Sequence, residues 1–348
     1  MSAVPLDTAN PQFPCSASSD SPDSPPRIPA ESRALPARTV EIIGAAIGCG
    51  AGDPRCEHGP DALREWGFAD RLAALGCGTL WREQIYPHYG TRKMVPQTIV
   101  PEFCERLMLS VAAACRRGAL PLVLGGDHSC GIGTWSGVHR TVWQRGPLGL
   151  MWIDAHMDSH TPDTTPSGAL HGMPLAALLG YGDTSLVRLG GIHAKLAARN
   201  VCLIGVRSFE PGEASLVERL GVRIFFAEEV RRRGMPAVLA DALAIVQSGT
   251  IGFGVSIDLD AIDPADAPGV GTPVSEGIPG ADLVAALTAL SVSPGLLGLE
   301  IVEYNPFLDR AGATRELVLQ LAAAALGRAP RRVTLDARAH GAAPRLAA

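Results

Sequence analysis

The sequence lacks the features of a membrane protein or a nucleic-acid-binding protein. No apolar stretch reaches the roughly 18–20 residues that a transmembrane helix needs. Lys and Arg form no dense run, and a net charge of −5 over 348 residues gives no basic surface for nucleic acid. The N-terminus has neither the charged start nor the apolar core of a secretory signal, so we expect a cytoplasmic protein.

Paired cysteines are absent as well. The eight cysteines include no C-x-x-C pair, and their spacing does not indicate a zinc site or a disulfide framework. In a large intracellular chain, cysteines scattered in this way are mostly small buried hydrophobic residues. We therefore assign no function to Cys15, Cys49, Cys56, Cys77, Cys104, Cys115, Cys130 or Cys202.

Both ends of the chain lack apolar periodicity. Residues 1–38 are dense in Pro, Ser, Ala and Asp, and such a segment buries too little surface to offset its ordering entropy. We expect a disordered leader over 1–38 and a flexible tail over 329–348. Acidic residues within the first 25 positions disfavour a transit peptide. The folded domain is expected to cover 39–328.

Between these ends, short apolar runs alternate with helical patterns. The runs are nearly continuous in hydrophobic residues, which is typical of strands covered on both faces. Strands are predicted within 39–47, 121–126, 148–156, 201–208, 222–230, 250–260 and 296–305, and helices over 60–75, 101–118, 235–247 and 314–328. Alternation of this kind predicts a parallel sheet. The fold class is therefore α/β, a single domain with three α/β/α layers and a central, mostly parallel sheet.

Acids and histidines gather where three of these strands end. Gly-Gly-Asp-His-Ser covers 125–129, Asp-Ala-His-Met-Asp covers 154–158, and Ser-Ile-Asp-Leu-Asp covers 256–260. The carboxyl ends of parallel strands line the ligand crevice of an open sheet, so the three clusters should converge. Residues at i and i+2 of an extended backbone point to the same side, which predicts that each cluster aims at one point.

The composition of these clusters favours divalent metal ions. Each motif alone is weak, because Gly-Gly-Asp is common in turns and Asp263 before Pro264 reads as a turn or helix cap. Together they supply two histidines and four aspartates, more than one ion takes. Carboxylate oxygens with a few imidazoles suit Mn²⁺ better than a zinc–thiolate site.

The three segments, in this order, resemble the arginase branch of the ureohydrolase family from about Val40 to about Leu326. The resemblance implies a single α/β/α domain that forms a homo-oligomer, a trimer or hexamer. It also implies two ions, most often Mn²⁺, with Ni²⁺ or Co²⁺ in some members. One ion would be held by His128, Asp154, Asp158 and Asp258, and the other by Asp154, His156, Asp258 and Asp260, with Asp154 and Asp258 bridging.

The resemblance also implies catalytic residues. His171 matches the family's proton-shuttle histidine, and Glu303 matches the glutamate that pairs with the substrate guanidinium. Asp158 counts as both a ligand and a catalytic residue. His171 could instead be a loop histidine that caps a turn. Glu300 is a competing acid, but its odd offset from Glu303 points it to the other side of the strand.

Substrate choice depends on the loop between Asp158 and His171, whose 13-residue offset matches arginases. Ser167, Glu213 and Thr272 belong to the expected substrate-binding set, together with His160 and Glu210. Departures from the arginase pattern are His160 and Ala169 in place of Asn, and Glu210 in place of Asp. We expect L-arginine as the substrate and urea as a product, with 4-guanidinobutyrate or agmatine as the alternative.

Two alternatives of another class stay open at this point. A deacetylase-like amidohydrolase with one zinc would carry a paired-histidine motif, and no His-His occurs. A non-catalytic partner subunit would have lost metal ligands, and all six positions are filled. The glycine-rich segment from Gly48 to Gly59 has no G-K-[ST] or G-x-G-x-x-G motif, which argues against a phosphate-binding loop.

Overall fold

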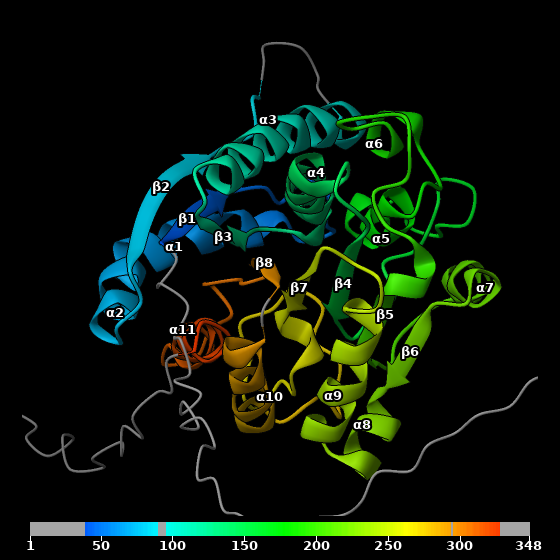
Figure 1. The fold of residues 1–348 in the computed structure, drawn as a ribbon. Helices are drawn as coiled ribbons and strands as arrows, with labels where there is room; N and C mark the ends of the chain where they lie inside the picture. The colour runs from blue at the N-terminus through cyan, green and yellow to red at the C-terminus, as the bar shows by residue number, and fades with distance from the viewer. Residues whose placement is uncertain (1–38, 90–94, 294, 328–348) are drawn as a thin grey trace, which may run out of the picture. The chain divides into compact units, whose positions relative to one another are not determined.

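A single parallel sheet forms the centre of the protein (Figure 1). The computed structural model describes residues 39–89, 95–293 and 295–327, so the predicted leader and tail lie outside the described residues. The strands are β1 Val40–Ala45, β2 Thr79–Ile85, β3 Leu120–Gly125, β4 Leu148–Ile153, β5 Val201–Val206, β6 Arg223–Phe226, β7 Gly252–Asp258 and β8 Leu296–Val302. Their order is β2-β1-β3-β8-β7-β4-β5-β6, and every pairing is parallel.

Strand residues alternate between two hydrophobic layers, one on each face of the sheet. Val123 in β3 packs into one layer, whereas its neighbours Leu122 and Leu124 pack into the other. This alternation follows from the two-residue repeat of a strand. Both faces are apolar because helices cover both, which explains the nearly continuous hydrophobic runs.

Helices form the two outer layers (Figure 1). One layer contains α3 Pro96–Arg116, α4 Gly131–Val142, α5 Pro174–Leu178, α6 Thr184–Val187 and α7 Pro211–Leu220. The opposite layer contains α1 Gly59–Glu65, α2 Phe68–Ala74, α8 Ala227–Arg233, α9 Met235–Val246, α10 Gly280–Leu287 and α11 Ala313–Ala325. The predicted three-layer α/β/α fold class is confirmed. In the described part of the chain, no helix is long and apolar enough to cross a membrane.

Several predicted boundaries were wrong. The edge strand β2 was missed because its sequence, TLWREQI, is polar and half exposed. The helix predicted over 60–75 is two helices, because Gly67 adopts a left-handed φ of 79° between them. Helix α3 starts at Pro96, five residues before Pro101, which the sequence offers as an equally good first-turn proline. The strand predicted over 222–230 ends at Phe226, and Ala-Glu-Glu then begins α8.

The order of the strands positions the functional residues. Strands β3, β8, β7 and β4 are consecutive neighbours at the centre of the sheet. The Gly-Gly-Asp-His segment leaves β3, the Asp-rich segments leave β4 and β7, and Glu303 follows β8. Gly126 is needed here, since a Cβ at that position would lie 1.7 Å from the Ile47 carbonyl oxygen. The carboxyl ends of four adjacent strands therefore meet at one place, and the sequence predicted this convergence for three of them, β3, β4 and β7.

Candidate metal centre and active site

His128 lies at the centre of the first group of candidate metal ligands. It belongs to the 3-10 helix η2 (His128–Cys130), directly after the turn that leaves β3. Its Nδ1 atom is 3.2 Å from an Asp154 oxygen, 3.1 Å from an Asp158 oxygen and 3.2 Å from an Asp258 oxygen. All four residues are buried. The structure thus brings together the four residues predicted to hold one ion.

His156 lies at the centre of a second group that shares Asp154. Its Nδ1 atom is 3.5 Å from Oδ1 of Asp154 and 3.2 Å from Oδ2 of Asp260. Asp154 turns its other oxygen, Oδ2, toward His128. One carboxylate with an oxygen in each group has the arrangement of a bridging ligand. Asp258 lies in the His128 group, and its role as a second bridge stays a prediction.

Turns rather than extended strands aim these side chains. Strand β4 ends at Ile153, and Asp158 has a left-handed φ of 48°. Oδ1 of Asp154 accepts a hydrogen bond from the backbone N–H of His156 at 2.7 Å, and Oδ1 of Asp258 accepts one from Asp260 at 2.8 Å. Such bonds curl the backbone into Asx turns. The explanation by i, i+2 alternation was therefore wrong, although the residues do converge.

Two contacts made by Trp152 hold Asp154 and His128 of the first group in position. The Trp152 indole N–H donates to Oδ2 of Asp154 at 2.9 Å. The same indole stacks on the imidazole of His128, with ring centroids 4.1 Å apart and an interplanar angle of 10°. Trp152 is a strand residue two positions before Asp154. In the sequence it is one more hydrophobic residue of the strand, so its hydrogen bond to Asp154 was not predicted.

A buried chain of polar groups continues behind His128. The Nε2 atom of His128 lies 2.9 Å from the Ser256 hydroxyl, which donates to Glu300 at 2.6 Å. Glu300 also accepts from the Trp135 indole N–H at 2.9 Å. Groups that hold the second nitrogen of a ligating histidine fix its ring orientation and tautomer. Sequence reasoning missed Ser256 as a functional residue and considered Glu300 only as a rival to Glu303.

The residues present fit divalent cations. Among the described residues, Nδ1 of His128 and Oδ2 of Asp158 are buried atoms without a hydrogen-bond partner. Such orphaned polar atoms are costly unless something else binds them. Burial, followed by the charge of Asp154, raises the pKa of Asp158 to about 6, and burial raises the pKa of Asp258. Cations beside these carboxylates would favour their ionised forms.

His171 and Glu303 meet at the edge of this cluster. Nδ1 of His171 is 3.1 Å from Oε1 of Glu303, which also accepts a hydrogen bond from the backbone N–H of His128 at 2.9 Å. Burial acts to lower the pKa of His171, but the contact with Glu303 outweighs it and raises the pKa to about 9. Glu303, like Asp158, has a positive φ, 66°. Strained backbone of this kind occurs mostly at functional sites.

His160 joins the two glutamates at the start of α7. Its Nε2 atom is 3.0 Å from Oε2 of Glu210 and 3.6 Å from Oε2 of Glu213, and its Nδ1 atom is 3.2 Å from the Thr164 hydroxyl. Glu210 and Glu213 form a capping box on α7. Contact with His160 lowers the pKa of Glu210, whereas burial raises that of Glu213 to about 8. Two departures from the arginase pattern, His160 and Glu210, are thus direct partners.

The remaining predicted substrate residues lie apart from this group. Ser167 is exposed, and its hydroxyl accepts from the Ala169 backbone N–H at 3.2 Å. Thr272 donates to Oδ2 of Asp260 at 2.8 Å, so it contacts a candidate metal ligand. Their roles in binding substrate stay predictions. Arg207 was not predicted, yet its guanidinium donates to several backbone carbonyls, including that of Asp260 at 2.7 Å.

Comparison with known proteins identifies the family to which the chain belongs. The model of the arginase family matches residues 38–327. The arginase of Brevibacillus brevis is 39% identical over 295 residues, covering 83% of this chain and 98% of that protein. The crystal structure of Bacillus caldovelox arginase has a TM-score of 0.77 at 37% identity, covering 83% of this chain and 98% of that one. Entamoeba histolytica arginase in complex with L-ornithine has a TM-score of 0.78 at 28% identity, covering 85% and 100%.

The matched residues contain all the segments described above, from β1 to α11. The predicted family is confirmed, and the deacetylase-like alternative loses its basis. The buried His and Asp groups are consistent with a metal-dependent reaction. This chain belongs to the arginase family, the hydrolases that cleave carbon–nitrogen bonds of linear amidines.

Proposed function

We propose that this protein hydrolyses L-arginine to L-ornithine and urea, using two Mn²⁺ ions. The observation that carries the proposal is the pair of His/Asp groups sharing Asp154, with His171 and Glu303 at their edge. Relatives named arginase at 34–39% identity support the choice of substrate. The L-ornithine complex of the Entamoeba histolytica arginase supports a site that accepts an α-amino acid.

The proposed ligands are the six predicted ones. His128, Asp154, Asp158 and Asp258 would hold one ion, and Asp154, His156, Asp258 and Asp260 the other. When bound, such a pair of cations supplies a hydroxide nucleophile at neutral pH. Carboxylates outnumber imidazoles in both sets, which favours Mn²⁺, with Ni²⁺ or Co²⁺ as alternatives. The contacts from Trp152 and Ser256 hold Asp154 and His128 in place for this role.

His171 and Glu303 would divide the remaining chemistry between them. The contact with Glu303 raises the pKa of His171 and so favours the protonated ring, which could donate its proton to the leaving amine. The buried Glu303 carboxylate can accept the planar guanidinium, which orients its carbon for attack. Since Oε1 of Glu303 already contacts His171, the same carboxylate would align the proton donor with the substrate.

His160, Glu210 and Glu213 would recognise the far end of the substrate. In the proposed reaction, the His160 imidazole donates a hydrogen bond to the α-carboxylate, and Glu210 faces the α-amino group. A second candidate is 4-guanidinobutyrate, which lacks the amino group. The 3.0 Å contact between His160 and Glu210 favours it, because the Glu210 carboxylate already has His160 as a partner. Agmatine is less favoured, because it has no α-carboxylate for His160 to bind.

Urea release by the purified protein tests the proposal. The protein would be loaded with Mn²⁺ and, separately, with Ni²⁺, and assayed with L-arginine, 4-guanidinobutyrate and agmatine. L-arginine with Mn²⁺ should give the highest kcat/KM. Turnover of 4-guanidinobutyrate above that of L-arginine would select the second candidate. Urea release from none of them, with both ions bound, would support the non-catalytic partner subunit instead.

Two further predictions remain to be tested. The resemblance implies a homo-oligomer, a trimer or hexamer, which light scattering on the purified protein would determine. The cytoplasmic location expected from the sequence would be tested by fractionating the source cells.

A further inference from the structure

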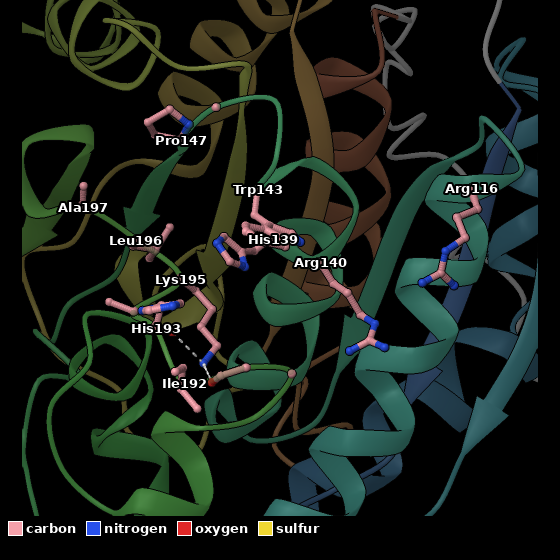
Figure 2. Close-up of a pocket in the computed structure, with 14 residues that line it drawn as sticks. Arg116, His139, Arg140, Trp143, Pro147, Ile192, His193, Lys195, Leu196 and Ala197 are labelled. Atoms are coloured by element: carbon pink, nitrogen blue, oxygen red, sulfur yellow. Dashed lines mark hydrogen bonds between the residues drawn. The ribbon is translucent and has the colours of Figure 1, made fainter.

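A large groove lies away from the candidate metal centre (Figure 2). Its volume is about 970 Å³, and its lining comes from the ends of α3 and α4, the turn before β4 and the segment 190–197 before β5. These segments precede the strands, whereas the metal-ligand residues follow them. The groove therefore lies at the amino ends of the strands, at the edge opposite the catalytic cluster.

The groove gathers basic side chains and no acids. Its lining includes Arg116, His139, Arg140, His193 and Lys195, and neither Asp nor Glu. Within the described ranges, the side chains of Arg116 and Arg140 make no hydrogen bond or ion pair. Both are exposed and free to bind an anion. A guanidinium presents a planar fork of N–H donors that matches phosphate and carboxylate groups.

Lys195 adds a third basic group to the groove, and burial lowers its pKa to about 8. It is buried, and its ammonium donates to the backbone carbonyls of Val187, Gly191 and His193, the last two of which are drawn in Figure 2. These bonds tie the segment 187–195 around the cation. Burial, followed by the charges of Lys195 and His193, lowers the pKa of His139 to about 4. Because the lining holds no Asp or Glu, the charges of Arg116, Arg140 and Lys195 are not paired with an acid within it.

The other half of the groove is apolar. Trp143 is 55% exposed and Ile192 is 75% exposed, which is unusual for side chains of this size. In Figure 2, Trp143 and His139 lie between the two arginines on one side and Pro147 and Leu196 on the other. An exposed indole between an apolar wall and cations can stack on a flat ring while the cations bind a charged group.

We propose that this groove binds a nucleotide-like ligand, a planar ring joined to a phosphate group. Inorganic phosphate would use the arginines and leave the apolar half empty. A neutral ring compound would leave the cations unpaired. Several cations around one concavity favour a multiply charged phosphate over a single carboxylate, because each added charge strengthens the attraction. The groove is separate from the catalytic cluster, so its occupant is a ligand other than the substrate.

Calorimetric titration of the metal-loaded, full-length protein tests this proposal. The probes are ADP and AMP, with adenosine as the ring without phosphate, inorganic phosphate as the anion without a ring, and indole-3-acetate as a ring with a carboxylate. ADP should bind saturably at one site per chain, tighter than AMP. Adenosine, phosphate and indole-3-acetate should each bind at least about tenfold more weakly, because each lacks part of the recognised chemistry.

Variants locate the binding site. Arg140→Ala should weaken ADP binding about tenfold or more, and Trp143→Ala should weaken it without abolishing binding of the phosphate. Arg145→Ala is the matched control, since Arg145 is exposed nearby but does not line the groove. Metal content and urea release confirm that each variant folds. The proposal is overturned if ADP does not bind, or if Arg140→Ala binds it as tightly as the control.

Arg140→Glu tests whether the groove is instead an interface between copies of the chain. The proposal is also overturned if this variant changes the oligomeric state in light scattering but leaves ADP binding unchanged.

Discussion

Nε2 of His160 lies 3.0 Å from Oε2 of Glu210, so two residues that distinguish this chain from the arginase pattern form one interacting pair. The pair sits beside the candidate metal centre, with Glu213 buried behind it. A histidine and a glutamate can offer a substrate either both charges or, when they satisfy each other, neither. If the pair binds the far end of the substrate, as proposed, its state would govern which guanidino compound the site prefers.

Metal content gives the most direct prediction. Protein saturated with Mn²⁺ should contain close to two ions per chain by elemental analysis. Asp154→Ala should lose both ions, because Asp154 has an oxygen in each ligand group. Asp258→Ala should also lose both if Asp258 bridges. Asp163→Ala, which removes an exposed loop acid, should keep both.

The alternatives are distinguishable in the same assay. If Asp258→Ala retains one ion, Asp258 serves only the His128 group. A single ion in the unmodified protein, kept in Asp154→Ala, would falsify the binuclear assignment.

The polar chain behind His128 predicts an effect on metal affinity. Ser256→Ala breaks the link between His128 and Glu300, and Glu300→Gln removes its charge. Each change should weaken Mn²⁺ binding roughly tenfold, while turnover at saturating metal is largely kept. Metal titration followed by urea release measures both quantities. Ser215→Ala, on the exposed face of α7, is the control. Unchanged affinity in Ser256→Ala would mean that packing on Trp152 alone orients His128.

His171 predicts a defect in catalysis without metal loss. His171→Ala should keep both ions and lower turnover by roughly 10²-fold, the effect expected for losing a general acid. Free imidazole added to the assay should restore part of the activity. A variant with normal turnover would show that His171 only caps its loop and that another group delivers the proton.

A buried ion pair predicts how stability depends on pH. Hydrogen bonds from Arg117, joined by Arg82, lower the pKa of Glu41 from 4.5 to about 2 despite its burial. A lowered pKa stabilises the fold above pH 4.5, and the stabilisation is lost as the pH falls toward 2. Glu41→Gln should therefore cost roughly 2 kcal/mol at pH 7, allowing for screening of the half-exposed arginines.

Urea denaturation at several pH values measures this difference. Comparing the variant with the unmodified protein at each pH cancels the titration of the metal cluster. The difference should shrink below pH 4.5. Glu65→Gln, an exposed acid, should differ little at any pH. A difference for Glu41→Gln that stays constant down to pH 2 would contradict the lowered pKa.

The sequence predicted the fold class and the metal cluster because both depend on strong local patterns. Buried strands appear in the sequence as apolar runs. Acids that follow neighbouring parallel strands lie close together even when the conformation of each turn is unknown. The edge strand β2 was missed because its polar sequence contains no apolar run, and the break at Gly67 was missed because it barely disturbs the helical periodicity.

Contacts between distant segments were beyond the sequence. Glu300 is 44 residues from Ser256, and only the pairing of β7 with β8 brings them together. The contact between His160 and Glu210 likewise joins residues 50 positions apart. Each residue was noticed as a departure, but their partnership depends on where the loop after β4 meets the start of α7. The groove lined by the ends of α3 and α4 and by the segment 190–197 also depends on tertiary packing alone.

Substrate preference tests the His160–Glu210 pair itself. If His160 binds the α-carboxylate and Glu210 the α-amino group, L-arginine should exceed agmatine by well over tenfold in kcat/KM, because agmatine leaves a buried polar partner unpaired. His160→Asn should then be tolerated or improve turnover of L-arginine, and Glu210→Gln should weaken it selectively. L-ornithine, which carries both α-groups, should compete with the substrate.

A preference for 4-guanidinobutyrate over L-arginine would have a different physical meaning. If 4-guanidinobutyrate is the better substrate and L-ornithine does not inhibit, Glu210 is held by His160 and does not bind an amino group. Glu210→Gln would then free His160 to bind the carboxylate more strongly, and turnover of 4-guanidinobutyrate should rise rather than fall.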